Sequence, residues 1–408
     1  MHDKFLSICF QLASQGETLA YPNPLVGCVI TYQDKIIAQG FHREYGKPHA
    51  EPNAINSFFE SQANSGIKLE DCNIYINLEP CSHHGKTPPC ADLITKHGFK
   101  KLIYSSKDPN PLVAGKGAEA ICLSSIEVLG PESLNDRTKQ ESTYLNRVFF
   151  HRLNYPFWLS CKIARDEKLS MNSPPKHGSQ WFTNEESRRS VHRLRSTHQL
   201  LITSISTVLA DNPSYNIRFS PEALGLADIK DPDILILKNR NNFSSEDYSQ
   251  LKIFQTQSPR RILEKKNNSD YHDFTELLTT LAQDGYTKTL IEAGPRLSLE
   301  FLKSGLVNEL IIYQKLTKED FVLLKHLDNF LDLAYEPCSD KVPALFKKFI
   351  SDEMSLAFIA NAEKFYLSIQ FCYSDTDVPD LEIRLTGRTY RFHKTQIIPN
   401  NNGGGDRI

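Results

Sequence analysis

Pro48-His49-Ala50-Glu51 and Glu79-Pro80-Cys81-Ser82-His83-His84-Gly85-Lys86-Thr87-Pro88-Pro89-Cys90 are two short clusters that set the architecture of the first half of the chain. The groups singled out in them are the imidazole of His49, the thiols of Cys81 and Cys90, and the carboxylate of Glu51. Three nitrogen and sulfur ligands that leave a fourth position open are typical of a catalytic zinc. The clusters therefore predict a Zn²⁺ site held by His49, Cys81 and Cys90, with Glu51 beside it as a group that does not bind the metal.

This constellation matches the one used by zinc-dependent base deaminases, in which a Glu that is not a ligand moves protons. Zinc acidifies a bound water, and a carboxylate two residues from the His ligand is well placed to carry its proton to the departing ammonia. Apolar residues recur at helical spacing after Pro48, so His49 and Glu51 are expected at a helix start. Cys90 is expected to begin a second helix that ends at Gly98, and a helix start favours the thiolate.

Taken separately, these residues have ordinary explanations. A His-Ala-Glu tripeptide occurs by chance, and two cysteines are usually small buried apolar residues. Their joint occurrence, with a predicted strand ending at Glu79-Pro80-Cys81, favours zinc. The insert 82–89 is longer than the two residues typical between the cysteines of nucleic-acid and cytidine deaminases, which argues against tRNA editing.

Length and composition limit the number of domains, the cellular location and the kinds of partner that can be expected. A chain of 408 residues exceeds one hydrophobic core, so two domains are expected. The net charge of −2 argues against a nucleic-acid partner. The nine cysteines show no pairing pattern, which predicts a reducing, cytoplasmic location. The N-terminus lacks a signal-peptide pattern, and no apolar run has membrane-spanning length, so no membrane partner is expected.

Both halves of the chain have α/β patterns. In the first half the order of helix, hairpin, helix, strand, helix and strand predicts a three-layer α/β/α domain. In the second half a strand at Phe157–Ala164 carries Lys162, and Thr183-Asn184-Glu185-Glu186 has the form of a capping box with Thr183 at the N-cap. A later strand, Thr287–Ala293, runs into Gly294-Pro295, a strand-to-helix turn of the kind that can bind a cofactor phosphate.

Several motifs of the chain resemble one family, the bifunctional deaminase/reductase of the riboflavin pathway. The resemblance rests on the long insert between the cysteines and on four motifs of the second half: Gly178-Ser179-Gln180-Trp181-Phe182-Thr183, His192-Arg193-Leu194-Arg195, Thr207-Val208-Leu209-Ala210-Asp211-Asn212-Pro213 and Ile291-Glu292-Ala293-Gly294-Pro295. It implies a cytidine-deaminase-like domain followed by a dihydrofolate-reductase-like domain. We accordingly expect a zinc-dependent pyrimidine deaminase domain at 1–153, a reductase-like domain at 154–371, and an extension of unknown role at 372–408 whose end is disordered.

The resemblance also implies two successive reactions on a small phosphorylated pyrimidine. Zinc-dependent hydrolysis removes the 2-amino group of 2,5-diamino-6-ribosylamino-4(3H)-pyrimidinone 5′-phosphate, and NADPH then reduces the ribosyl side chain to ribityl. A homo-oligomer is expected. The residues implied to contact substrate are Asn23, His42, His83, Lys86, Ser179, Arg195, Tyr215, Arg218 and Glu292. Those implied to line the cofactor site are Trp181, Thr207, Asp211 and Gly294, and the polar groups expected to act in the hydride step are Lys162 and Asp211.

Several residues that the resemblance assigns to substrate binding also have ordinary structural explanations. Asn23 between two prolines is also a common turn former, and His42 could lie on a loop surface. Arg195 and Arg218 could each belong to a solvent-exposed helix face or turn.

Three departures from the family pattern fall in the second half. Lys168 stands where the family has a glycine, Lys238 stands where it tends to have Asp, and Gln314-Lys315-Leu316-Thr317 lacks its proline-lysine-glycine turn. These departures support a second hypothesis, in which the protein is a zinc deaminase whose second half serves substrate binding or assembly and does not reduce substrate. A protein that zinc merely stabilises, without catalysis, is a third hypothesis.

Overall fold

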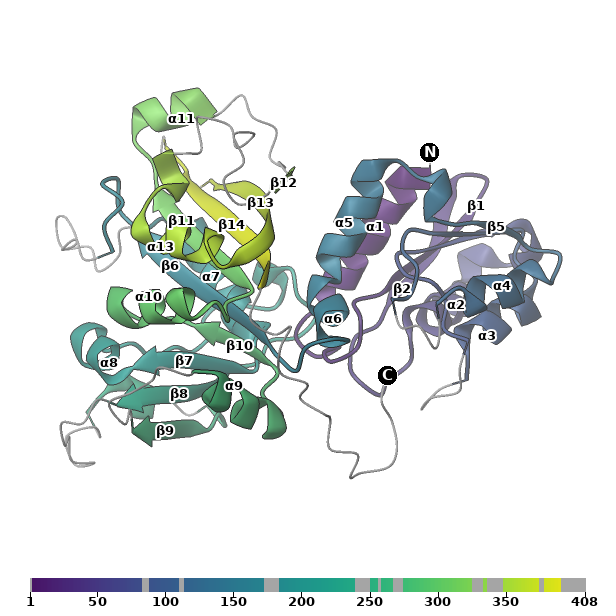
Figure 1. The fold of residues 1–408 in the computed structure, drawn as a ribbon. Helices are drawn as coiled ribbons and strands as arrows, with labels where there is room; N and C mark the ends of the chain where they lie inside the picture. Colours follow the sequence, from purple (N-terminus) through teal and green to yellow (C-terminus); the bar gives the residue numbers. More distant parts are fainter. Residues whose placement is uncertain are drawn as a thin grey trace. The chain divides into compact units, whose positions relative to one another are not determined.

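The computed structural model describes residues 2–82, 88–109, 114–171, 183–238, 250–255, 258–266, 274–324, 333–335, 348–373 and 378–389. Over these residues the chain forms two compact units, each with its own sheet (Figure 1). The first unit contains the residues up to Asn154 and also Pro221–Ile229; the second contains Tyr155–Ser220 and the described residues from Lys230 onward.

Pro221–Ile229 falls within the range that the sequence assigns to the reductase-like domain, yet it packs with the first unit. The Ala227 N–H donates to the Gln15 carbonyl at 2.9 Å. The Arg43 guanidinium donates to both carboxylate oxygens of Asp228, at 2.8 and 2.9 Å. A segment from the second half of the sequence is thus a structural part of the first unit.

In the described part of the first unit, five strands form a sheet in the order β2-β1-β3-β4-β5. β1 is antiparallel to β2 and β3, whereas β3, β4 and β5 are parallel. The strands are β1 (Gly27–Tyr32), β2 (Lys35–Phe41), β3 (Asn73–Ile76), β4 (Lys101–Tyr104) and β5 (Glu127–Leu129). The helices are α1 (His2–Gln15), α2 (Ala50–Glu60), α3 (Cys90–His97), α4 (Lys116–Cys122), α5 (Asp136–Leu145) and α6 (Arg147–Arg152).

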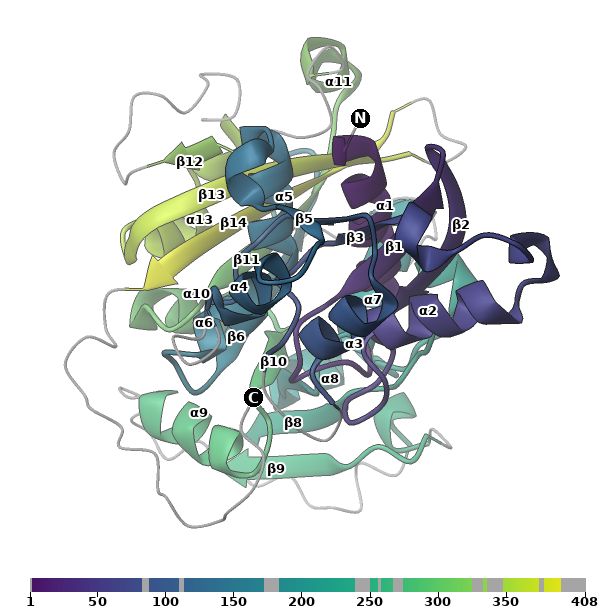
Figure 2. The ribbon, with the colours of Figure 1, turned by 90° about the vertical axis from the view of Figure 1, so that its right-hand side faces the viewer.

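Alternate residues of these strands face opposite layers, as the strand period requires. Val29, Tyr75 and Ile103 pack against apolar residues of α1. Their neighbours along the strands pack against α2, α3 and α4 on the other face. Figures 1 and 2 show α1 beside α5, and α2 beside α3. The expected three-layer α/β/α architecture is confirmed.

In the described part of the second unit, nine strands form a sheet in the order β12-β13-β14-β11-β6-β10-β7-β8-β9. The strands are β6 (Trp158–Arg165), β7 (Leu200–Ser204), β8 (Asp233–Lys238), β9 (Ile262–Lys266), β10 (Lys288–Ile291), β11 (Glu309–Lys315), β12 (Leu333–Tyr335), β13 (Ala362–Cys372) and β14 (Asp380–Thr389). The helices are α7 (Glu185–Ser196), α8 (Ile205–Asp211), α9 (Phe274–Gln283), α10 (Pro295–Ser304), α11 (Lys318–Leu324) and α13 (Glu353–Ile359).

The six strands from β11 to β9 in this order are parallel, and they carry the main core on the face covered by α9, α10 and α13. On the other face of the sheet, α7 and α8 pack over two smaller apolar clusters. The prediction of a second α/β domain is confirmed. None of the described helices has the length and apolarity needed to cross a membrane.

The C-terminal part of the sheet reaches past residue 371, where the sequence predicts the reductase-like domain to end. Residue 371 lies inside β13, and β14 pairs antiparallel with both β13 and β11, forming the long yellow pair in Figure 2. Leu381, Ile383 and Leu385 belong to the main core. Residues 380–389 are therefore a strand of this sheet and not a separate extension, because alternate apolar residues fix them to it. The expected disordered end lies outside the described residues.

The structure also accounts for the departures from the family pattern. In the turn after β6 the left-handed residue is Leu169, with φ 65°, whereas Lys168 does not adopt positive φ and donates its N–H to Asp166. Arg165, with a side chain 1% exposed, binds Asp352, the N-cap of α13. Lys238 pairs with Glu264 on the neighbouring strand.

After Tyr313, where the family has a proline-lysine-glycine turn, this chain continues its strand and then begins a helix. β11 continues through Lys315, and the Thr317 hydroxyl then accepts the Asp320 N–H at the start of α11. One local expectation of the sequence is wrong: the N-cap of α7 is Asn184 and not Thr183, because the Asn184 side chain accepts the Ser187 N–H.

Candidate active sites

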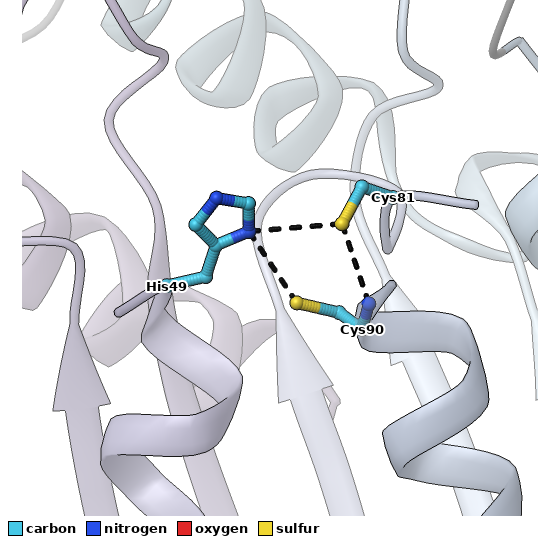
Figure 3. Close-up of side chains that lie close together, drawn as sticks. All are labelled: His49, Cys81 and Cys90. Atoms are coloured by element: carbon cyan, nitrogen blue, oxygen red, sulfur yellow. Dashed lines mark hydrogen bonds between the residues drawn. The ribbon is translucent and has the colours of Figure 1, made fainter. Parts of the chain in front are cut away.

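The predicted metal ligands converge in the first unit (Figure 3). The Nδ1 atom of His49 lies 3.6 Å from the Cys81 sulfur and 3.4 Å from the Cys90 sulfur, and all three ligand atoms lie within 4.8 Å of one another. His49 directly precedes α2, Cys90 is the first residue of α3, and Cys81 lies in the loop after β3. Three elements distant in sequence therefore deliver one ligand atom each to one point.

The spacing fits a tetrahedral zinc. With Zn–S of about 2.3 Å and Zn–N of about 2.0–2.1 Å, tetrahedral angles place a sulfur and a nitrogen ligand about 3.6 Å apart. The backbone N–H of Cys90 also donates to the Cys81 sulfur at 3.3 Å. Hydrogen bonding from the Cys90 thiol lowers the pKa of the Cys81 thiol to about 4, so a thiolate is already favoured at one of the two positions. The donor set of one imidazole and two thiols suits Zn²⁺.

Glu51 lies on the first turn of α2, where it is 3% exposed. Burial raises the pKa of its carboxyl above the ordinary value, although the nearby His49 opposes the shift. A carboxyl with a raised pKa near the ligand cluster can both accept and return a proton. α2 is held close to β2 because Gly40 lets the helix backbone approach, and a Cβ at this position would lie 2.4 Å from the Ala54 nitrogen.

Glu79 is a buried group near this centre that the sequence does not single out. Its carboxylate accepts the backbone N–H groups of Asp108 (3.2 Å), Gly115 (3.0 Å) and Ala118 (3.2 Å). It thereby ties the loop that carries Cys81 to the start of α4. The only signal in the sequence is its place two residues before a ligand, since its partners are backbone groups that carry no sequence signature.

Asn23 and His42 also lie together near the metal ligands. The Asn23 Nδ2 atom lies 3.1 Å from His42 Nε2, and the His42 ring meets the His49 ring edge-on with centroids 5.4 Å apart. The other ring nitrogen, Nδ1, lies 3.0 Å from the Pro48 carbonyl oxygen. His42 is 2% exposed, so it is not a loop-surface residue.

The second unit contains a buried ionic centre at Glu292, which directly follows β10. Arg195 donates to both of its carboxylate oxygens, at 2.9 and 2.6 Å, and the Lys162 ammonium lies 3.0 Å from one of them. Burial opposes ionisation of Glu292, but the charges of Arg195 and Lys162 outweigh it and hold the pKa of this carboxyl well below its ordinary value. Three residues from β6, α7 and the end of β10 thus form one charge cluster.

Tyr215 and Asp211 adjoin this cluster. The Tyr215 hydroxyl lies 2.9 Å from the Thr203 hydroxyl and 3.3 Å from the Glu292 carbonyl oxygen, and the backbone of Tyr215 has φ 51°, which is unusual for a bulky residue. Partial burial raises the pKa of Asp211, and the nearby charge of Lys162 counteracts that shift. Arg195, Lys162, Glu292, Tyr215 and Asp211 are therefore brought to one region.

Arg218 adds positive charge near Arg195. Burial, followed by the charge of Arg195, lowers the pKa of the Arg218 guanidinium. Burial together with both arginines lowers the pKa of His192 to about 3. Clustered guanidinium groups are suited to a phosphate, which they can bind through several charge-assisted hydrogen bonds.

The turn from β10 to α10 brings Thr207 and Gly294 together. The Gly294 N–H donates to the Thr207 hydroxyl oxygen at 2.9 Å, and Gly294 is the N-cap of α10. Because Pro295 has no N–H, the donors that the first turn offers to a cofactor phosphate are those of Arg296 and Leu297. Four predicted site residues, His83, Lys86, Ser179 and Trp181, lie outside the described residues.

Comparisons with known proteins find matches for both halves of the chain. Residues 1–106 match the family model of the cytidine and deoxycytidylate deaminase zinc-binding region, and residues 172–315 match that of the RibD C-terminal domain. The riboflavin biosynthesis protein RibD of Bacillus amyloliquefaciens is 32% identical over 333 residues, or 77% of this chain and 84% of its own length. The protein of the same name from Escherichia coli is 30% identical over 77% of this chain and 87% of its own length.

Solved structures give the same result over nearly the whole chain. A RibD structure from Acinetobacter baumannii matches with a TM-score of 0.61 and 26% identity, covering 95% of this chain and 99% of that one. A deaminase/reductase structure from Thermotoga maritima has the same fold, with a TM-score of 0.64, 24% identity and coverage of 95% and 99%.

The fold and the sites define a zinc-dependent deaminase fused to an NADPH-dependent reductase. The protein takes part in riboflavin biosynthesis with both activities. The chain belongs to the RibD family.

Proposed function

We propose that the first unit deaminates 2,5-diamino-6-ribosylamino-4(3H)-pyrimidinone 5′-phosphate and that the second unit then reduces the ribosyl group of the product to ribityl. The convergence of His49, Cys81 and Cys90 beside the buried carboxyl of Glu51 is the observation that carries the proposal. We assign the first reaction to the domain at 1–153 and the second to the reductase-like domain that begins at 154, with β14 included.

In the deamination, His49, Cys81 and Cys90 hold the metal, and Glu51 moves the proton. When bound, zinc supplies a Lewis acid that lowers the pKa of a water ligand. The Glu51 carboxylate takes a proton from the attacking water and returns it to the departing ammonia. Its raised pKa supports this exchange, because both of its protonation states are then accessible closer to neutral pH. Asn23, His42, His83 and Lys86 are the proposed substrate contacts.

In the reduction, NADPH supplies the hydride, and the chain binds and orients the reactants. Arg195 and Arg218 bind the substrate phosphate, while Glu292 orients Arg195 and Lys162 through their ion pairs. Lys162 and Asp211 are the groups proposed to hold or move the proton that accompanies hydride transfer. Ser179 and Tyr215 complete the substrate site, and Trp181, Thr207 and Gly294 complete the cofactor site.

A coupled assay on the natural phosphorylated substrate tests both reactions in one sample. We expect release of ammonia followed by oxidation of NADPH. Ammonia release without NADPH oxidation, at high enzyme concentration and with the deaminated product supplied, would leave a deaminase with a binding module. No ammonia release by zinc-loaded protein would contradict the first assignment.

The proposed location is the cytoplasm, since two thiol ligands must stay reduced to bind the metal. A homo-oligomer is proposed as well, and light scattering of the zinc-loaded protein decides between it and a monomer.

A further inference from the structure

We infer that Asn146 is a positioning residue of the deaminase site: its side-chain amide fixes the backbone of Leu25, and thereby the loop that carries Asn23. Its effect on the reaction is indirect, because it acts through Asn23, one of the proposed substrate contacts. The inference rests on the proposed function for the identity of the substrate. Asn146 lies between α5 and α6, beyond residues 1–106, which match the deaminase family model, so that match does not single it out.

The first step is the pairing of Asn146 with a single residue of the loop. Its Oδ1 atom accepts the Leu25 N–H at 2.8 Å, and its Nδ2 group donates to the Leu25 carbonyl oxygen at 3.0 Å. Because a backbone N–H only donates and a carbonyl only accepts, the orientation of the amide is defined. One buried side chain thus binds the peptide groups on both sides of Leu25, as a neighbouring strand would.

The second step connects this pairing to the metal centre through a second buried amide. Asn77 donates to the Leu25 carbonyl oxygen at 2.8 Å, and its Oδ1 atom accepts the Gly27 N–H at 2.7 Å. Asn77 directly follows β3, in the segment that leads to Cys81, and its backbone carbonyl accepts the hydroxyl of Ser142 on α5 at 2.8 Å. The loop is therefore fixed relative to the strand end that delivers a metal ligand.

The third step concerns the other end of the loop, which the same helical segment holds. Arg152, the last residue of α6, places its guanidinium over the Tyr21 ring, 5.1 Å from the centroid. Leu145, the last residue of α5, packs beside Leu25 in a small apolar cluster. Asn23 lies between the two anchored residues of the loop. A short loop held at both ends has few conformations left to lose, so Asn23 is presented to the substrate in one place.

Two substitutions test the role of Asn146 in the full chain. Asn146→Ala removes both hydrogen bonds and leaves the Leu25 N–H buried without an acceptor, whereas the Leu25 carbonyl keeps its bond from Asn77. We expect it to raise KM for deamination about tenfold, the effect of one lost hydrogen bond, and to change kcat by less than about threefold, because the ligands and Glu51 are unaltered. Asn146→Asp keeps the shape but turns an oxygen toward the Leu25 carbonyl, so KM should rise in this variant too.

A double-mutant cycle with Asn23→Ala shows whether Asn146 acts through Asn23. In the Asn23→Ala background we expect Asn146→Ala to raise KM no further. Equal fold-changes in both backgrounds, or an unchanged KM in both Asn146 variants, would overturn the inference. Zinc content should equal that of the wild type, and its loss in both variants would overturn the inference as well. Asn135→Asp, at the exposed N-cap of α5, is the matched control and should leave KM unchanged, because Asp caps a helix as well as Asn does.

A second measurement does not depend on turnover. Amide hydrogen exchange of the zinc-loaded full chain reports whether the Leu25 N–H is protected. We expect slow exchange in the wild type and exchange about tenfold faster in Asn146→Ala, with the amides of α1 unchanged. Fast exchange at Leu25 in the wild type, or equal exchange in the two proteins, would overturn the inference even if no substrate is turned over. Slow exchange that depends on Asn146, in a protein that releases no ammonia, would instead contradict only the proposed function.

Discussion

The two sites of this protein balance their charges in opposite ways. In the first unit, His49, Cys81 and Cys90 point at a common centre, and they need an external cation to complete the arrangement. In the second unit, Glu292 is already paired with Arg195 and Lys162. The first site therefore needs a bound cation to balance its thiolates, whereas the charges of the second are balanced by side chains of the chain itself. Substitutions in the first should change chemistry more than stability, and the reverse should hold at the centre of the second.

The largest effect is expected for Glu51→Gln. It removes the group that moves the proton while leaving all three ligands in place, so ammonia release should fall by about two to four powers of ten. Zinc content, measured by atomic absorption, should be unchanged. NADPH oxidation on supplied deaminated product should also be unchanged, and its parallel loss would contradict the separation of the two sites.

The next effect is expected for Glu292→Gln. The substitution leaves Arg195 and Lys162 buried without their counter-charge, which typically costs about 3–5 kcal/mol in the free energy of unfolding. Denaturant unfolding of the second unit should shift by this amount, with Glu300→Gln on the exposed face of α10 as the matched control. A shift below about 1 kcal/mol would show that the cluster is hydrated and weakly coupled.

The same carboxylate predicts a dependence of stability on pH. Its pKa in the folded protein is depressed below the ordinary value of 4.5, so its contribution is complete above that value and is lost as the pH falls below it. We expect the free energy of unfolding of the second unit to decrease below about pH 4.5, and to decrease less in Glu292→Gln. Unfolding curves at a series of pH values measure this difference, and parallel curves for the two proteins would count against it.

A smaller effect is expected for Glu79→Gln. One carboxylate oxygen becomes an NH₂ group that faces backbone N–H donors, which should cost about 1–3 kcal/mol. Because the loop carries Cys81, competition with a chelator should also show weaker zinc binding. Glu60→Gln, an exposed change in α2, is the control. Unchanged zinc affinity together with reduced stability would restrict Glu79 to a role in folding.

The smallest effect is expected for Asp228→Asn, which breaks the ion pair between Arg43 and the segment Pro221–Ile229. The Arg43 side chain is 58% exposed and that of Asp228 is 26% exposed, so the pair should contribute only about 0–1 kcal/mol. The difference from wild type should shrink further at high salt. A larger loss, measured by thermal unfolding of the first unit, would mean that the whole segment detaches.

The metal centre was predictable from the sequence because its ligands are rare residue types beside clear helix starts. Pro48 marks the helix start beside His49, and the helix that ends at Gly98 begins at Cys90. The end of the predicted strand places the third ligand, Cys81. Asn184 shows the limit of such reasoning. Thr183-Asn184-Glu185-Glu186 contains two good N-cap residues in succession, and only the tertiary hydrogen bonds of Asn184 to Asp380 and Cys372 select the second.

The sequence could not predict contacts that depend on distant backbone. Glu79 binds three N–H groups, and any residue type could supply them. The Pro221–Ile229 segment packs on the first unit through a backbone hydrogen bond and one exposed ion pair. Lys168 stands where the family has a glycine, but the left-handed residue of this turn is the next one, Leu169.

Gly117 carries no functional group, yet the metal centre depends on it. A Cβ at this position would lie 1.9 Å from the Pro80 carbonyl oxygen, in the peptide that leads into Cys81. Even alanine would therefore have to displace backbone next to a ligand. In a library of random variants selected for growth without added vitamin, position 117 should tolerate as few replacements as the ligands themselves, so a scan for sensitive positions would find a residue that no chemical argument nominates.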